Sequence, residues 1–68
     1  MQFEIRWSRY YPQEKRLEFN AQGSREGVPF TVVSEGHCTK APETEANVRL
    51  VVLLRLTEMF GRQSASGA

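Results

Sequence analysis

The segment KRLEFNAQGSREGVPFTVVS, residues 15–34, decides the fold of this chain. In its first part Leu17, Phe19 and Ala21 alternate with polar residues, which is the period-two pattern of a half-buried β-strand. A second alternating run follows the glycine-framed stretch Gly23–Gly27. Glycines at both ends of a short polar stretch are typical of a hairpin connection. The segment therefore predicts a β-hairpin whose loop is residues 23–27.

The second strand of this hairpin covers residues 28–34 and places Val28, Phe30 and Val32 on one face. Pro29 has no N–H to donate to a neighbouring strand, so it favours a position at the edge of the sheet. We therefore expect this strand to end the sheet on one side.

The N-terminal residues 2–8 alternate in the same way. Phe3, Ile5 and Trp7 fall on one side of the chain, and charged or hydroxyl residues fall on the other. Pro12 predicts a break after this strand. With the hairpin, this strand completes a three-stranded antiparallel meander.

Residues 44–60 fit two patterns. Every even position in 46–56 is apolar, as in a strand, but the spacing of the apolar residues also fits one face of a helix. That helical face consists of Ala46, Leu50, Leu53, Leu54 and Phe60. Residues 43–60 contain no Gly or Pro and are too many for a typical strand, and Gly61 follows as a C-terminal cap. We expect a helix; a fourth strand would instead give a four-stranded sheet or small barrel.

The predicted fold class is α+β, a three-stranded antiparallel β-meander packed against one C-terminal α-helix. A chain of 68 residues has room for one domain, which we place at residues 1–62. Residues 63–68 are small and polar, so we expect a disordered C-terminal tail.

The predicted helix is apolar on more than one face. Val48, Val51, Val52 and Met59 lie largely outside the face of Leu50 and Leu54, and one helix on one small sheet buries a single stripe. We expect an interface of a homodimer, or of a complex with a partner protein, along Val48, Val52, Leu56 and Met59. The alternative is that the small sheet curls round the helix and covers them.

A cluster of cations and aromatic residues forms the strongest candidate binding site. It consists of Arg6, Trp7, Arg9, Tyr10 and Tyr11. Trp, Tyr and Arg dominate protein–protein hot spots, and the same residue types stack on nucleic-acid bases and pair with phosphates. Acidic neighbours such as Glu4 and Glu18 dilute any phosphate-attracting field, which favours a protein partner. A single-stranded nucleic acid is the alternative, and a structural role of Trp7 in the core is the third interpretation.

The remaining composition excludes most kinds of chemistry. The formal charge is only +1, and the one cysteine, Cys38, cannot form an intrachain disulfide. His37 precedes it, but neighbouring residues of an extended chain point to opposite faces, so the pair is no catalytic dyad. We expect no metal, no cofactor and no enzymatic activity. The sequence starts with no secretory pattern and holds no apolar run long enough to cross a membrane, so we expect a cytoplasmic protein.

The function we expect is that of a non-enzymatic protein-binding module, a regulator or inhibitor that docks on the surface of another protein. In its size and in its lack of a catalytic motif the chain is similar to phage-encoded inhibitors of bacterial defence systems. That resemblance implies a bacterial or phage protein that acts by covering its target.

Overall fold

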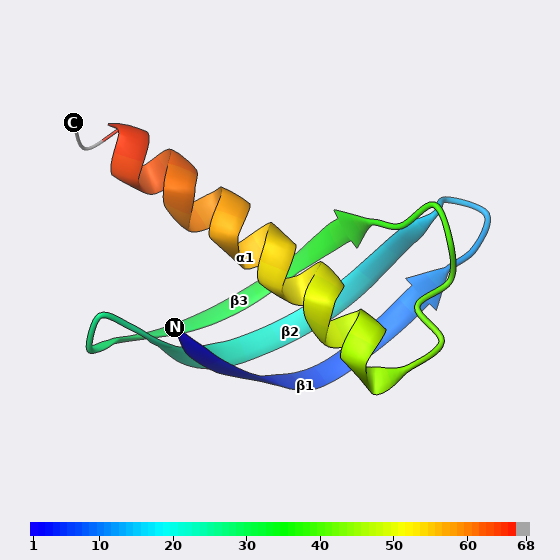
Figure 1. Cartoon of the computed structure of the whole chain (residues 1–68), viewed down its shortest axis with the longest axis horizontal. Coiled ribbons are helices and arrows are strands. Elements are labelled where there is room, and N and C mark those ends of the chain that lie inside the picture. The colour runs from blue at the N-terminus through cyan, green and yellow to red at the C-terminus, as the bar shows by residue number, and fades with distance from the viewer. Residues whose placement is uncertain (67–68) are drawn as a thin grey trace.

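The computed structural model describes residues 1–66, and side chains through residue 61. Three strands precede one helix (Figure 1). The elements are β1 (Gln2–Tyr11), β2 (Arg16–Arg25), β3 (Val28–His37) and α1 (Glu45–Ser66). The strands pair antiparallel in the order β1-β2-β3. The predicted fold class, a β-meander with a C-terminal helix, is confirmed.

The β2–β3 hairpin is tighter than the sequence predicted. Its connection is only Glu26 and Gly27, both with positive φ (53° and 80°), which is the combination of a type I′ turn. The predicted loop over residues 23–27 is therefore wrong, because β2 continues through Gly23 to Arg25. Glycine is needed at position 23 for a different reason: a Cβ there would overlap the carbonyl oxygen of Gln2 on β1.

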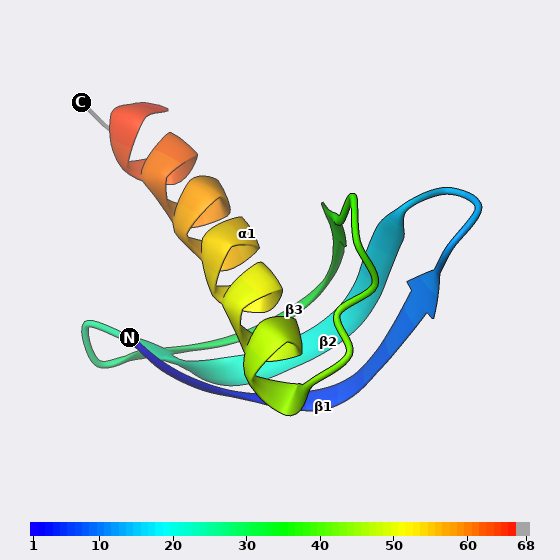
Figure 2. The same ribbon diagram turned by 45° about the vertical axis from the view of Figure 1, so that its right-hand side comes forward.

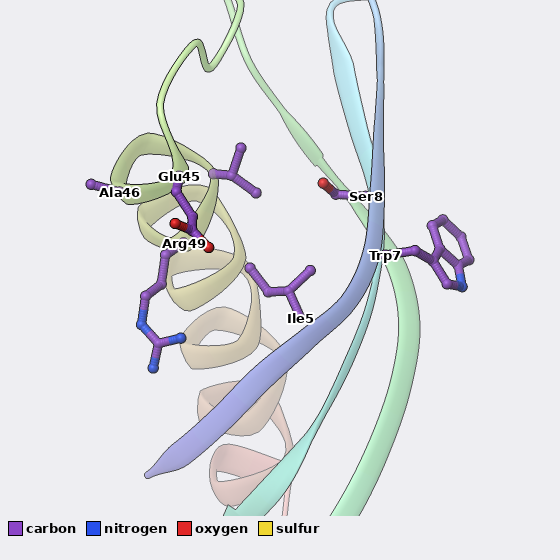
Figure 3. Close-up of a pocket in the computed structure, with 7 residues that line it drawn as sticks. Ile5, Trp7, Ser8, Glu45, Ala46 and Arg49 are labelled. Atoms are coloured by element: carbon purple, nitrogen blue, oxygen red, sulfur yellow. The ribbon is translucent and has the colours of Figure 1, made fainter.

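A β-bulge interrupts β1. Ile5 lies opposite Ala21 and Trp7 lies opposite Asn20, so Arg6 is an extra residue without a partner position. One extra residue moves every following side chain to the other face of the sheet. The prediction that Ile5 and Trp7 share a face is therefore wrong. Ile5 points toward α1, whereas Trp7 points away from it (Figure 3).

The core lies between α1 and the concave side of the curved sheet (Figure 2). The fully or nearly fully buried apolar residues are Leu17, Phe19, Ala21, Cys38, Val52 and Leu56. The alternation predicted for β2 is thus confirmed, and its three inward residues form the floor of the core. Phe30 of β3 and Phe60 of α1 close one end, with ring centroids 5.1 Å apart in an edge-to-face arrangement.

Thr44 caps the N-terminus of α1. Its Oγ1 accepts a hydrogen bond from the backbone N–H of Asn47 (3.1 Å), and its carbonyl accepts one from Val48 (3.0 Å). At the other end the helix continues through Gly61 to Ser66, so the prediction that Gly61 ends the helix is wrong. The tail predicted for residues 63–68 is helical as far as Ser66, and residues 67–68 lie outside the described residues.

The helix packs with the opposite face from the one expected. Val52 and Leu56 are completely buried, and Val48 packs against them. Met59 is half-buried on the same side. The prediction that these four residues form an intermolecular interface is therefore wrong, because they lie on the inner face of α1 and Val52 and Leu56 are core residues. The structure instead shows the alternative, a curved sheet that covers this face of the helix (Figure 2). Leu50, Leu53 and Leu54, which we call the leucine stripe, are exposed instead.

Two arginines explain this orientation. Arg49 and Arg55 stand three residues before and after Val52, so each lies about 60° to one side of it on the helix. From there Arg49 donates to the carbonyl of Phe3 on β1 (3.1 Å), and Arg55 donates to Oγ of Ser34 on β3 (3.3 Å). If Leu50 faced the sheet, Arg49 and Arg55 would each lie about 100° or more from the sheet-facing side of the helix. Neither guanidinium group could then make its hydrogen bond to β1 or β3.

Candidate functional site

The face of the sheet turned away from α1, which we call the open face, carries three of the predicted binding residues of β1. Its side chains form cross-strand rows because the three strands pair in continuous register after the bulge. The rows are Trp7–Asn20–Val33, Arg9–Glu18–Glu35 and Tyr11–Arg16–His37. No element of the described part of the chain packs over this face (Figures 1 and 2).

The first row is the apolar part of the open face. Trp7 is 44% exposed and Val33 is 64% exposed, and Asn20 lies between them. The Oδ1 atom of Asn20 is buried, and no donor among the described residues reaches it. A buried acceptor without a partner costs about 1–3 kcal/mol. This row therefore joins exposed apolar surface to a polar group that the chain itself leaves unsatisfied.

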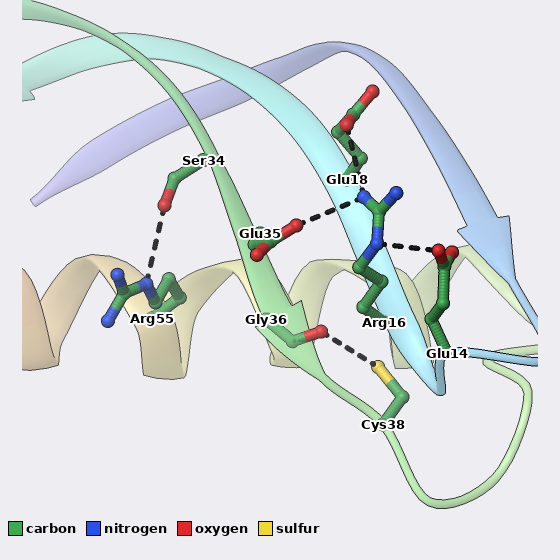
Figure 4. A network of polar contacts seen from close by, with 8 residues as sticks. All are labelled: Glu14, Arg16, Glu18, Ser34, Glu35, Gly36, Cys38 and Arg55. Atoms are coloured by element: carbon green, nitrogen blue, oxygen red, sulfur yellow. Dashed lines mark hydrogen bonds and ion pairs between the residues drawn. The ribbon is translucent and has the colours of Figure 1, made fainter.

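The second and third rows are polar and internally paired. The Arg16 guanidinium contacts carboxylate oxygens of Glu14 (3.3 Å), Glu18 (3.1 Å) and Glu35 (3.0 Å), as Figure 4 shows. Partial removal from water lowers the pKa of Arg16, but its hydrogen bond to Glu18 and the charges of the other two carboxylates outweigh that effect and raise it. The positive charge of Arg16 is thus neutralised by the three neighbouring carboxylates.

The predicted cluster is divided between the two faces. Trp7, Arg9 and Tyr11 lie together on the open face. Tyr10 points the other way, packs against the core and donates its hydroxyl proton to the carbonyl of Cys38 (3.2 Å). Arg6 is the exposed extra residue of the bulge. The structure therefore brings three of the five predicted residues into one surface.

Tyr11 is already covered on one side of its ring. The Arg16 guanidinium carbon lies 3.9 Å from the ring centroid, and that of Arg9 lies 5.3 Å from it. A base could not stack on the ring where Arg16 lies, and Arg16 is itself neutralised by carboxylates. Trp7 is therefore the main exposed aromatic group of the open face.

A groove of about 480 Å³ lies between β1 and the start of α1 (Figure 3). Ile5 and Val48 line its apolar part, and Ser8, Glu45 and Arg49 supply its polar groups. Arg49 also contacts the Phe3 ring, with its guanidinium carbon 4.2 Å from the centroid. The groove is broad and open, and its arginine is engaged within the chain.

His37 and Cys38 lie in different environments. His37 is exposed at the end of β3, whereas Cys38 is buried and its Sγ donates to the carbonyl of Gly36 (3.8 Å). Burial raises the pKa of the Cys38 thiol above its ordinary value, which disfavours the reactive thiolate. Among the described residues, no group of three or more His, Cys, Asp or Glu side chains is arranged to hold a metal ion.

Three features of the surface do not follow from the predictions above. Val33 follows Val32 and so breaks the alternation of β3, which is a signal that it points away from the core. The leucine stripe was assigned to the core side, although the symmetric placement of Arg49 and Arg55 about Val52 indicates the true inner face. The sequence does not mark Asn20 as a site residue, because a polar residue is expected on the solvent side of a strand.

Comparison with protein families, with curated proteins and with solved structures finds no match to this chain. Within residues 1–66, no helix combines the length and apolar character required to cross a membrane.

Proposed function

We propose that this chain is a non-enzymatic protein-binding module that docks on another protein through the open face of its sheet. The observation that carries the proposal is the Trp7–Asn20–Val33 row, in which two exposed apolar side chains, Trp7 and Val33, flank Asn20 on a face that no element of the described residues covers. Trp is among the residue types most enriched at binding hot spots. An apolar partner surface matches the exposed side chains of this row.

The polar rows support a protein partner over a nucleic acid. Arg16 is tied to three carboxylates, and Glu18 lies opposite Arg9 in the register. Nucleic-acid binding rests largely on free cations that replace phosphate counterions. An open face whose Arg16 is paired with three carboxylates instead resembles the polar rim of a protein interface. By covering its partner, such a module would act as a regulator or inhibitor.

The test is affinity capture from a bacterial lysate with three forms of the chain. Trp7→Ala removes the centre of the open face, and Leu54→Ala is the matched control on the far side of α1. We expect proteins captured by the wild type and by Leu54→Ala to be lost with Trp7→Ala. Capture of the same proteins by all three forms would contradict the proposal. Quenching of Trp7 fluorescence by oligonucleotides at low salt would favour a nucleic acid instead.

A further inference from the structure

The two edges of the sheet are not equally open to a further strand. On β1 the bulge at Arg6 interrupts the edge, and Arg49 of α1 donates a hydrogen bond to the Phe3 carbonyl (3.1 Å). A bulge and an element that covers the strand are both means by which proteins keep an edge strand from pairing. β3 has no such interruption, because its register with β2 runs from Val28 to His37 without a shift. Within the described part of the chain no other strand pairs with this edge (Figure 1).

Hydrogen bonding at the end of β3 shows which of its backbone groups point outward. The N–H of Cys38 donates to the carbonyl of Lys15 (2.8 Å), so these residues form a hydrogen-bonded pair. Opposite residues of antiparallel strands alternate between hydrogen-bonded and non-hydrogen-bonded pairs. Counted back along the register, every even-numbered residue of β3 turns its N–H and carbonyl toward β2. The odd-numbered residues turn theirs to the outer edge; they are Pro29, Thr31, Val33, Glu35 and His37.

The outer edge of β3 is accessible and can form hydrogen bonds along its length. All five odd-numbered residues are exposed, and only Pro29 lacks an N–H. The helix does not seal the edge, because a groove of about 320 Å³ remains between α1 and the C-terminal part of β3, beside Gly36 and Leu54. A row of outward N–H and carbonyl groups at every second residue is the surface to which an extended strand adds. The ligand that matches this edge is therefore another β-strand.

The sequence of β3 makes its own copy a matching strand. If two β3 strands pair antiparallel about a two-fold axis at Val33, each Val33 lies opposite its counterpart, and Thr31 of each copy lies opposite Glu35 of the other. His37 then lies opposite Pro29, so the missing proline N–H costs the ladder only its outermost bonds. No residue meets a like charge in this register. An axis at Glu35 would instead place two carboxylates opposite each other.

The same register joins the apolar parts of the two open faces. Val33 is 64% exposed in the single chain and would contact its counterpart directly. Directly opposite residues share a face of the sheet, so both open faces lie on the same side. Each Trp7–Asn20–Val33 row then continues into the same row of the other copy.

We propose that β3 pairs with β3 of a second copy through its outer edge, giving a two-fold symmetric dimer with one continuous sheet. The dimer would supply the outward N–H and carbonyl groups of each edge with partners. It would also present two Trp7 side chains on one surface. The proposal concerns the edge of the sheet and does not depend on whether the open face binds another protein.

Sedimentation equilibrium with variants at position 33 tests the dimer. The wild type should change from monomer to dimer between about 1 µM and 1 mM, the range of weak specific complexes. Val33→Pro removes an N–H that β2 does not use, and it should weaken self-association at least about 30-fold, because the dimer loses two central hydrogen bonds. Val33→Thr is the control: it keeps the N–H and the branched shape and should dimerise within about fivefold of the wild type. Far-UV circular dichroism confirms that both variants are folded.

A charge series at position 31 tests the register. Because Thr31 lies opposite Glu35 of the other copy, Thr31→Lys should tighten the dimer about tenfold and Thr31→Glu should weaken it about tenfold. Cross-linking gives a second readout in a Cys38→Ala background. Val33→Cys should form an intermolecular disulfide on oxidation, because the paired Cα atoms would be about 5.5 Å apart. Thr31→Cys should not, because its thiols would lie four residues apart along the ladder.

A wild type that stays monomeric at 1 mM would overturn the proposal. So would a folded Val33→Pro that dimerises as the wild type does, or equal effects of the two charges at position 31. If Val33→Pro does not fold, the charge series and the cross-link decide. Trp7→Ala should dimerise as the wild type does, so loss of the dimer and loss of partner capture are separate outcomes.

Discussion

Both faces of α1 carry large apolar side chains, yet only one of them is buried. The inner face places Val52 and Leu56 against β2 with no exposed surface, whereas the leucine stripe on the opposite side leaves Leu54 62% exposed. The inner face also brings Val51 and Phe60 against the core. Polar groups at its margins add to this preference, because Arg49 and Arg55 reach the edge strands only when Val52 faces the sheet.

The two faces of the sheet also differ in burial. The concave face is closed by the helix, and the open face keeps Trp7 and Val33 in contact with solvent. In a chain this short, one helix and three strands can enclose only one layer of side chains. The apolar residues left outside that layer are the candidates for binding.

The largest effect should separate the two faces of α1. Leu56→Ala opens a cavity in the core and should lower the free energy of unfolding by about 3 kcal/mol. Leu54→Ala removes the same atoms from the exposed stripe and should change it by less than about 0.5 kcal/mol. Urea denaturation measures both. Equal losses in the two variants would contradict the assigned orientation of α1.

Asn20→Val tests whether a residue of the open face costs the chain folding stability. It replaces the buried acceptor that has no partner among the described residues with a residue that favours strands, so stability should rise by about 1 kcal/mol. Thermal unfolding measures the change. A less stable variant would show that Asn20 is satisfied in solution.

Gly61→Ala tests the helix beyond the core. Gly61 is inside α1, and a Cβ at this position meets no atom within 4 Å. Replacing a helical glycine by alanine should therefore raise the unfolding free energy by about 0.5 kcal/mol. Thermal unfolding followed by circular dichroism measures the change. If Gly61 instead capped the helix, as the sequence suggested, alanine would destabilise the chain.

The smallest effect concerns the buried thiol and pH. Burial raises the pKa of Cys38 in the folded chain above 9.0, its ordinary value. As pH rises past that value, the unfolded chain loses its thiol proton first, so folding stability falls. Cys38→Ala should lose less stability than the wild type between pH 8 and pH 10, as urea denaturation at each pH measures. A parallel decline in both proteins would show that the thiol plays no part.

The sequence alone predicted the fold class and the alternation of β2, since Leu17, Phe19 and Ala21 follow one period without interruption. The predicted face of Trp7 is wrong because the extra residue Arg6 turns every later side chain of β1 to the other face of the sheet. A period-two pattern in the sequence does not reveal such a bulge. The hairpin loop is shorter than the glycine spacing predicts, because Gly23 serves the close approach of β2 to β1 and not the turn.

The candidate site was harder to predict than the fold. Three members of the aromatic and basic cluster do share one surface, but Tyr10 turns inward to Cys38. The assignment of the inner and outer faces of α1 depends on hydrogen bonds to Phe3 and Ser34, which are far away in the sequence. Such long-range contacts appear only once the strands and helix are placed in space.

Thiol labelling of single-cysteine variants tests the orientation of α1 most directly. In a Cys38→Ala background, Val52→Cys places the thiol on the inner face and Leu54→Cys places it on the leucine stripe. With a thiol reagent at low micromolar protein concentration, Leu54→Cys should react at the rate of a free thiol. Val52→Cys should react at least about 100-fold more slowly, because it is exposed only when the chain opens. Equal rates, or faster labelling at position 52, would contradict the account.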